Sequence, residues 1–353
     1  MIPSSPFKPR RWLANGHLQT IVGNFLPRTD TLPAATTHLV AVPLPDEMAA
    51  LPWAVALDAA LPSHVLCHAH WQQDLADAIT VVLVHGLEGS SNSQYVVGNA
   101  NRLYAAGCNV IRMNMRNCGG TDALSPTLYH SGMSGDVRAV LRWLIHRGCT
   151  RVVLAGYSMG GNLVLKAVGE LGAEAPPQLL GVVAVSPPMD LRESADALHS
   201  PANRLYERRF LRNLKARYMR KVRLFPAVFD PATIAQVRSI RDFDECAVGT
   251  YCGFTGADDY YARSGAERVL GRIAVPALVL HACDDPFIRL TAATRNTIAA
   301  NEHITLLQPA HGGHCAFLED AAPGYDGYWA ERTLMQFVKQ CATADARRLV
   351  PLC

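Results

Sequence analysis

Short runs of β-branched and aliphatic residues alternate with helical patterns along most of the chain, and this alternation limits the fold more than any other feature. Each run has the length of a strand and is apolar throughout, as in a parallel sheet covered on both faces. The intervening segments have helical periodicity, which is typical of a wound parallel sheet. The predicted strands are 79–86, 109–114, 151–158 and 179–188, and the predicted helices are 95–106, 132–146 and 159–171.

The alternation breaks near Asp190 and resumes with a predicted strand at 275–285. A further strand at 303–308 and a last helix at 327–341 complete the pattern. The residues between the two halves, about 190–270, have the composition of helices rather than of strands and turns. We therefore interpret 1–353 as a single domain of the α/β class, with a mostly parallel twisted sheet flanked by helices and an inserted helical cap at about 190–270.

The insertion combines regularly spaced apolar residues with a strongly basic run. Residues 203–223 contain nine Lys or Arg and a single acid, Glu207. We expect the basic side chains to face outward, either solvated or available to an anionic head group. The apolar positions recur at three-to-five-residue spacing and are expected to face inward. They are Leu205, Phe210, Leu214, Tyr218, Phe225 and Phe229.

Composition excludes several classes of protein. Apolar residues make up 49% of the chain and charged residues 18%, which fits a folded core and not a disordered chain. A formal net charge of +3 argues against a nucleic-acid partner. The ten cysteines include no CxxC pair, which indicates reduced thiols. The N-terminus lacks a signal-peptide pattern, and the longest apolar stretch, 48–67, is too interrupted for a transmembrane segment, so we expect a cytoplasmic protein.

The sequence Gly156-Tyr157-Ser158-Met159-Gly160 matches the G-x-S-x-G nucleophile elbow. An elbow places its serine on a sharp turn between a strand and a helix, and glycines flank the serine because the backbone packs too closely for Cβ atoms. Here a β-branched strand comes immediately before the motif and a helical pattern immediately after it. This context predicts Ser158 as a nucleophile.

A serine nucleophile needs a general base, and the base needs a carboxylate to orient it; with this elbow they follow in the order acid, then His. Asp284 and Asp285 both end the predicted strand 275–285. Asp285 is preferred because it lies farther past the strand and is followed by Pro286, and Asp284 remains the alternative. The base is predicted as His314, in a glycine-containing loop after the strand 303–308, with His311 as a supporting residue.

The oxyanion hole should consist of two backbone N–H groups, those of Met159 and Leu87. Leu87 lies between two glycines in the loop after the first buried strand, where His85 is expected to support the loop. His64, Cys67, His68 and His70 form the only metal-like cluster, but no matching acid or thiol pair accompanies them, so neither a metal nor a cofactor is expected.

Eight motifs between Phe7 and about Glu319 resemble those of the YheT-like family of α/β hydrolases. They are WLANGHLQTI, HGLEGSSNSQY, NMRNCGGT, YHSGMSGD, GYSMGGN, RDFDE followed by GF and DDYY, HACDDPF, and HGGHCAFLE. The resemblance implies an α/β-hydrolase fold and a cofactor-free serine carboxylester hydrolase, with nucleophile, acid and base on Ser158, Asp285 and His314. Residues 42–71 depart from it, being longer and more irregular than the family's second-strand region.

These observations predict cleavage of short- to medium-chain carboxylic esters through an acyl-enzyme on Ser158. The substrate would be a small ester or a lipid-like molecule, because related members of the family act on medium-chain acyl esters and phospholipids. Acyl transfer to an alcohol, or lipase or phospholipase activity, would use the same three residues. A binding protein without catalysis is the remaining alternative, although binding alone does not need an activated nucleophile.

Overall fold

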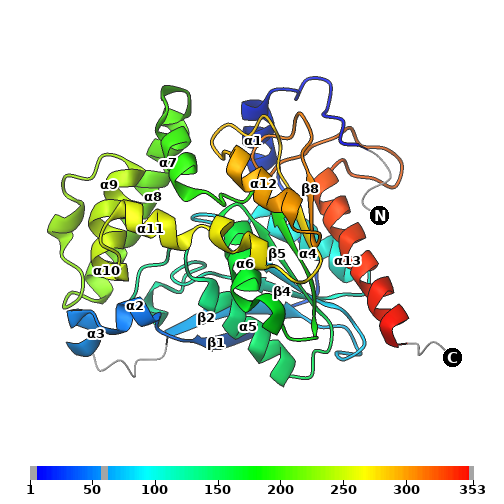
Figure 1. The fold of residues 1–353 in the computed structure, drawn as a ribbon, viewed down its shortest axis with the longest axis horizontal. Helices are drawn as coiled ribbons and strands as arrows, with labels where there is room; N and C mark the ends of the chain where they lie inside the picture. Colours follow the sequence, from blue (N-terminus) through cyan, green and yellow to red (C-terminus); the bar gives the residue numbers. More distant parts are fainter. Residues whose placement is uncertain (1–5, 57–62, 350–353) are drawn as a thin grey trace.

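The computed structural model describes residues 6–56 and 63–349, and its centre is an eight-stranded sheet with the order β1-β2-β4-β3-β5-β6-β7-β8 (Figure 1). The six strands β4, β3, β5, β6, β7 and β8 run parallel to one another, whereas β2 pairs antiparallel with both β1 and β4. The strands are β1 Thr36–Val42, β2 Ser63–His70, β3 Thr80–Val84, β4 Asn109–Met113, β5 Val152–Tyr157, β6 Leu179–Val185, β7 Ala277–Leu280 and β8 Ile304–Leu307.

Helices cover both faces of this sheet, as a parallel sheet requires. Val82 and Val84 of β3 belong to a core shared with α5 and α6, whereas Val81 and Leu83 belong to a second core shared with α4 and α13. The α-helices outside the insertion are α1 Gly16–Phe25, α2 Asp46–Ala49, α3 Pro52–Ala56, α4 Gln94–Ala105, α5 Ser134–His146, α6 Met159–Leu171, α12 Ala292–Ala300 and α13 Trp329–Leu349, and the 3₁₀ helices there are η1 Asp122–Leu124 and η2 Gly172–Glu174.

The chain between β6 and β7 forms helices and turns throughout, and Figure 1 shows most of them gathered on one side of the sheet. Its longest element is α8, which carries the basic run. The elements are α7 Leu191–His199, η3 Pro201–Asn203, α8 Arg204–Leu224, η4 Pro231–Ile234, α9 Ile240–Phe243, the π-helical turn η5 Asp244–Gly249, α10 Thr250–Cys252, α11 Ala257–Ser264 and η6 Ala266–Arg272.

The predicted strands and helices of the sheet are confirmed, although the last helix continues eight residues beyond its predicted end, and the expectation for the sides of α8 is wrong in part. The irregular segment 42–71 contains β2, which closes onto β1 and β4 in antiparallel register; residues 57–62 lie outside the described part. On α8, Leu205 faces solvent, with 78% of its surface exposed, while Arg217 and Lys221 are buried. The spacing therefore misplaces these three residues, whereas Leu214, Tyr218 and Phe229 are buried as expected.

Candidate active site

Ser158 lies at a sharp turn between β5 and α6, in a left-handed backbone conformation with a φ of 52°. The two flanking glycines are required by close packing. A Cβ on Gly156 would lie 2.2 Å from the carbonyl oxygen of Gly160, and a Cβ on Gly160 would lie 2.3 Å from that of Val84. Both distances are far shorter than real Cβ contacts, so the local backbone needs glycine at both positions.

The structure brings Ser158, Asp285 and His314 together from three separate loops. The Nε2 atom of His314 is 2.9 Å from the Ser158 hydroxyl, and its Nδ1 atom is 2.8 Å from the Asp285 carboxylate. A carboxylate only accepts hydrogen bonds, so Nδ1 carries the proton and Nε2 is free to accept from the serine. The other Asp285 oxygen accepts backbone N–H bonds from Phe287 and Ile288.

The two adjacent aspartates have different partners, which separates the alternatives left open by the sequence. Asp284 does not contact His314; its carboxylate accepts from the backbone N–H of Gly313 at 2.9 Å and lies 3.4 Å from Nδ1 of His311. Asp284 therefore holds the loop that carries His314. His311 remains beside Asp284, and its side chain is 45% exposed.

The N-terminal helix α1 also supports this loop, a role that the sequence motif did not reveal. The hydroxyl of Thr20 accepts the backbone N–H of His314 at 2.8 Å. Gly16 packs so closely against the loop after β7 that a Cβ would lie 2.0 Å from the carbonyl oxygen of Asp284. Residues nearly 300 positions apart in the sequence therefore fix the position of the imidazole.

Charge and burial together determine the pKa of the imidazole. Burial opposes a positive charge on His314, whereas the adjoining Cys315 thiol and the Asp285 carboxylate favour it, and the pKa of His314 lies above its ordinary value. Burial likewise disfavours the Asp285 carboxylate, but the neighbouring His314 outweighs that effect, and the pKa of Asp285 lies below its ordinary value. The pair is thus built to carry opposite charges once His314 takes up a proton.

The loop after β3 lies directly against Ser158 on its other side. A Cβ on Gly86 would be 3.1 Å from that of Ser158, so the backbone of Gly86 and Leu87 passes close to the serine. Tyr95 accepts the N–H of Gly86 at 2.8 Å. His85 engages the backbone with both ring nitrogens, Nδ1 to the carbonyl of Gly86 and Nε2 to the N–H of Met115. This buried histidine supports the loop, and burial lowers its pKa to about 4.

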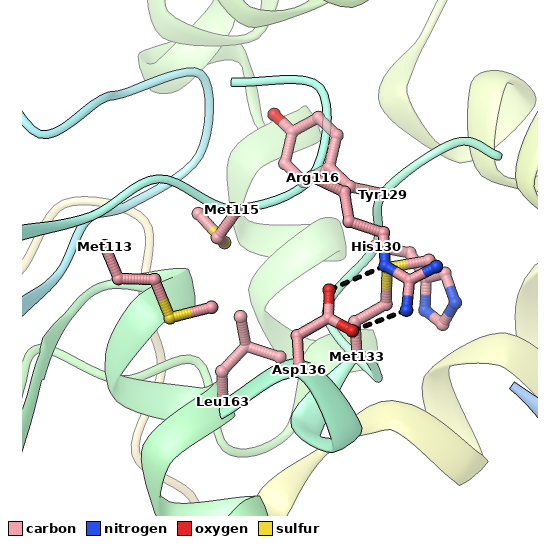
Figure 2. Close-up of a pocket in the computed structure, with 8 residues that line it drawn as sticks. All are labelled: Met113, Met115, Arg116, Tyr129, His130, Met133, Asp136 and Leu163. Atoms are coloured by element: carbon pink, nitrogen blue, oxygen red, sulfur yellow. Dashed lines mark hydrogen bonds and ion pairs between the residues drawn. The ribbon is translucent and has the colours of Figure 1, made fainter. Parts of the chain in front are cut away.

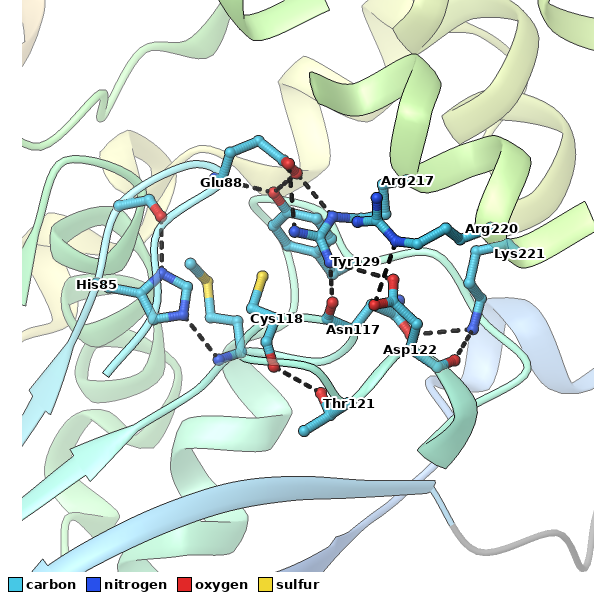
Figure 3. A network of polar contacts seen from close by, with 12 residues as sticks. His85, Glu88, Asn117, Cys118, Thr121, Asp122, Tyr129, Arg217, Arg220 and Lys221 are labelled. Atoms are coloured by element: carbon cyan, nitrogen blue, oxygen red, sulfur yellow. Dashed lines mark hydrogen bonds and ion pairs between the residues drawn. The ribbon is translucent and has the colours of Figure 1, made fainter. Parts of the chain in front are cut away.

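A salt bridge from the insertion holds the next residue of this loop (Figure 3). Glu88 has a φ of 56°, an uncommon conformation for a residue with a side chain. Arg217 of α8 donates to both of its carboxylate oxygens, at 2.8 and 3.2 Å. Tyr129 donates to the same carboxylate at 2.5 Å and accepts the backbone N–H of Glu88 at 3.0 Å. Neither Glu88 nor Arg217 was predicted, although Glu88 lies within the motif HGLEG.

The same helix reaches the loop after β4. Arg217 donates to the carbonyl of Asn117, which also has a left-handed backbone with a φ of 63°. Lys221 donates to the Asn117 side chain at 3.0 Å, to the carbonyl of Asp122 at 2.8 Å and to that of Ser125. Burial lowers the pKa of Lys221 to about 7, opposed by Asp122. Two basic side chains of α8 thus fasten the insertion to the loops that follow β3 and β4.

Behind these loops, an ion pair within the core fixes the chain after β4 (Figure 2). Arg116 donates to both carboxylate oxygens of Asp136, at 2.7 and 2.6 Å, and its side chain is completely buried. The void beside the pair is too narrow to admit a water molecule, so it is a packing defect and no ligand site. Its lining residues are Met113, Met115, Arg116, Tyr129, His130, Met133, Asp136 and Leu163.

The metal-like histidine and cysteine cluster lies on β2. His68 and His70 share one face of the strand and Cys67 lies on the other. His70 is buried, with its Nδ1 atom 3.0 Å from the carbonyl of Pro33. Among residues 6–56 and 63–349, no group of three or more His, Cys, Asp or Glu side chains could hold a metal ion. In the same part of the chain, no helix is long and apolar enough to cross a membrane.

Comparison with known proteins gives the class of this chain. Residues 79–321 match the family described as "alpha/beta hydrolase fold", and the chain therefore belongs to the α/β hydrolases. It is 31% identical over 323 residues to YheT of Escherichia coli (strain K12), which is named as an esterase. That alignment covers 89% of this chain and 88% of the relative, and it confirms the resemblance to the YheT-like family.

More distant relatives carry names of lipid-cleaving enzymes. The phospholipase ABHD3 of Mus musculus is 29% identical over 75% of this chain, which spans 64% of that protein. The monoacylglycerol lipase of Saccharomyces cerevisiae is 25% identical over 73% of this chain, which spans 58% of that protein. The homologues are thus hydrolases of the esterase and lipase type.

Solved structures of low sequence identity share the fold. The 2,6-dihydroxy-pseudo-oxynicotine hydrolase superimposes with a TM-score of 0.56 at 15% identity, covering 93% of this chain and 72% of that one. The Pyrococcus furiosus esterase Pf2001 superimposes with a TM-score of 0.54 at 13% identity, covering 97% and 100%. These likenesses establish the architecture and no more.

Proposed function

We propose that this protein is a serine hydrolase that cleaves carboxylic esters through an acyl-enzyme on Ser158. The observation that carries the proposal is the continuous hydrogen-bonded row from Ser158 through His314 to Asp285, at 2.9 and 2.8 Å. A serine hydroxyl is a weak nucleophile at neutral pH, and this arrangement supplies both a base and an acid that orients it. The homologues named as esterase, phospholipase and lipase support the same chemistry.

The proposed reaction has two halves. Nε2 of His314 takes the proton of Ser158 as the Oγ atom attacks the ester carbonyl carbon, and the backbone N–H groups of Leu87 and Met159 stabilise the oxyanion. His314 then gives its proton to the leaving alcohol, and an acyl-enzyme remains. Water, activated by the same imidazole, releases the acid and restores Ser158. An alcohol in place of water would give acyl transfer, the runner-up activity.

Aromatic side chains from the insertion favour acyl groups as substrates. The ring of Phe287 lies 4.4 Å from that of His314, between centroids, and Tyr206 and Phe210 of α8 contact Phe287 at 5.0 and 6.2 Å. An apolar surface beside the base stabilises acyl chains by burying CH₂ groups. We therefore propose short- to medium-chain acyl esters, including lipid-like esters, with residues of about 190–270 acting as a cap on a single 1–353 domain. A cytoplasmic location, supported by the cysteine spacing, belongs to the same proposal.

The largest expected effect is the loss of covalent labelling in Ser158→Ala. A fluorophosphonate probe should label the wild-type protein at Ser158 and leave this variant unlabelled. Hydrolysis of p-nitrophenyl butyrate should fall by about a thousandfold or more, because only binding and the oxyanion donors remain. The matched control is Ser200→Ala, whose hydroxyl lies outside the site and contacts Asn203.

Thermal unfolding should be nearly the same in the two variants, which separates chemistry from folding. Labelling of Ser158→Ala at the wild-type rate, or activity within tenfold of wild type, would contradict the assignment. A wild-type protein that never reacts with the probe would favour the binding protein without catalysis.

A further inference from the structure

Helix α1 buries two polar side chains and exposes three large apolar ones, the reverse of the pattern typical of a surface helix. Gln19 and Thr20 are buried, bonded to the backbone of Leu318 and His314. Leu18, Ile21 and Phe25 are 45% to 61% exposed. Their spacing of three and four residues places them on one side of the helix. Exposing a row of apolar side chains to water is unfavourable in free energy, and such rows are typical of binding surfaces.

A stripe of arginines on α8 lies beside this apolar row. Arg208, Arg209 and Arg212 are exposed, and with the exposed Leu205 they occupy positions i, i+3, i+4 and i+7 of one helix face. The guanidinium of Arg209 lies 5.0 Å from the centre of the Phe25 ring, which brings the two helices together at this surface. We define the α1–α8 face as Leu18, Ile21, Phe25, Leu205, Arg208, Arg209 and Arg212.

The charge of the face has one sign only. The sequence of α1 contains no acidic residue, and the single acid of the basic run, Glu207, is buried and bonded to His199 and to the N–H of Ile240. Exposed leucine, isoleucine and phenylalanine next to an uncompensated row of arginines form the two components by which peripheral proteins hold anionic bilayers. A partner with a purely apolar surface would leave the arginines desolvated and unpaired.

We propose that the α1–α8 face docks onto an anionic lipid surface. The apolar side chains enter the boundary of the acyl chains, and Arg208, Arg209 and Arg212 meet lipid phosphates. The face also adjoins the candidate active site. The His17 ring of α1 stacks on the Tyr206 ring of α8, with 5.8 Å between their centroids. Tyr206 in turn contacts Phe287, and the Phe287 ring packs against His314. Docking therefore brings a lipid surface beside the residues proposed to cleave esters.

The test is sedimentation of the 353-residue chain with vesicles, carried out with Ser158→Ala so that no lipid is consumed. One vesicle type is phosphatidylcholine alone, and the other contains equal parts of phosphatidylcholine and phosphatidylglycerol. The protein should sediment with the anionic vesicles and be released by salt. Leu18→Ser/Phe25→Ser should weaken this binding by at least about tenfold, given the apolar surface removed. Arg208→Gln/Arg212→Gln should weaken it by about fivefold per charge.

Matched variants and a second measurement keep the test decisive. Leu39→Ser/Val55→Ser removes two other exposed apolar side chains, on β1 and α3, and should bind like the parent. In an otherwise wild-type background, all of these variants should hydrolyse a dissolved short ester at the parent rate. The proposal is overturned if the parent fails to bind anionic vesicles, or if the α1–α8 variants bind as well as the controls.

Self-association of the chain that disappears in Leu18→Ser/Phe25→Ser, without vesicle binding, would also overturn it in favour of a second copy as the occupant. Vesicle binding is measured without turnover, so its failure leaves the proposed esterase activity standing.

Discussion

The two sides of Ser158 are held in place by different means. On the acid–base side, Asp285 receives hydrogen bonds from backbone N–H groups two and three residues further along the chain. On the side of Leu87, the proposed oxyanion donor, Glu88 is held by Arg217 of α8, 129 residues away in the sequence. The Asp285 carboxylate is thus held by its own loop, whereas the Glu88 carboxylate is held by a side chain of the insertion. The insertion also reaches the loop of Asp285, because Asn203 donates to the carbonyl of Pro286 at 2.7 Å, but it does not bond the carboxylate itself.

The acid–base side should show the larger loss when its charge is removed. Asp285→Asn should lower kcat by roughly a thousandfold to ten-thousandfold, because an amide no longer selects the imidazole tautomer with a proton on Nδ1. Asp284→Asn is the matched control at the adjacent position, and it should cost less than about tenfold because its side chain can still accept the N–H of Gly313. Steady-state hydrolysis of p-nitrophenyl butyrate measures both. Equal losses would show that the two aspartates share the role.

Substitutions that disturb the loop of Leu87 should lower activity less than Asp285→Asn does. One of them, Arg217→Met, changes a residue far from the reacting atoms. Arg217→Met should lower kcat by roughly tenfold to a hundredfold with little change in KM, because displacement of the loop misaligns a donor that acts mainly on the transition state. Glu88→Gln should have a smaller effect of the same kind, and the double variant should be no worse than Arg217→Met alone, because Arg217→Met removes both the contact with Glu88 and the hydrogen bond to the carbonyl of Asn117. The rate of labelling by a fluorophosphonate probe checks the same step.

A control on α8 distinguishes positioning from general damage to the helix. Arg212→Met removes an exposed arginine of the same helix and should leave kcat unchanged. If Arg217→Met raises KM and leaves kcat unchanged, the Arg217–Glu88 salt bridge contributes to substrate binding and does not position the oxyanion loop.

The difference between local sequence patterns and contacts of residues far apart in the sequence explains how far the structure could be predicted. Strands buried on both faces, such as Val152–Tyr157, are continuous apolar runs and were predicted directly. The strand Ser63–His70, which lies between β1 and β4, was missed because histidines and a serine interrupt its apolar pattern. The alternation and the elbow motif indicated which loops carry Ser158, Asp285 and His314.

The contacts of Glu88 and Thr20 could not be predicted in this way. Each depends on a partner far away in the sequence, and no local pattern shows that the two residues meet. Arg217 and Lys221 look like solvated residues in a basic run, and only their buried acceptors make an inward position stable. Leu205 was likewise wrongly expected to face the core, because spacing along the sequence does not show which positions of α8 have buried partners.

The pH dependence tests the charge coupling on the acid–base side. His314 acts as a base only when neutral, so kcat/KM should rise with pH through the pKa of His314 in the free enzyme. The sequence alone suggests an apparent pKa of about 6 to 7, but the Asp285 carboxylate stabilises the protonated imidazole, so the midpoint should lie above that range. In Asp285→Asn the midpoint should move to lower pH, because burial then acts without the compensating charge. A midpoint that does not move would show that Asp285 is not coupled to His314.

The smallest effects should come from the apolar contacts between the insertion and the acid–base side. Each CH₂ buried contributes about 0.8 kcal/mol, or about fourfold in kcat/KM. We therefore expect kcat/KM to rise from acetyl to about butyryl–octanoyl esters and then to fall once the chain outgrows the site. Phe210→Ala should flatten this rise, because Phe210 packs against Phe287 beside the base. Leu224→Ala, at the exposed far end of α8, should leave it unchanged. A maximum at acetyl in the wild-type enzyme would mean that the insertion only holds the oxyanion loop and does not select the acyl chain.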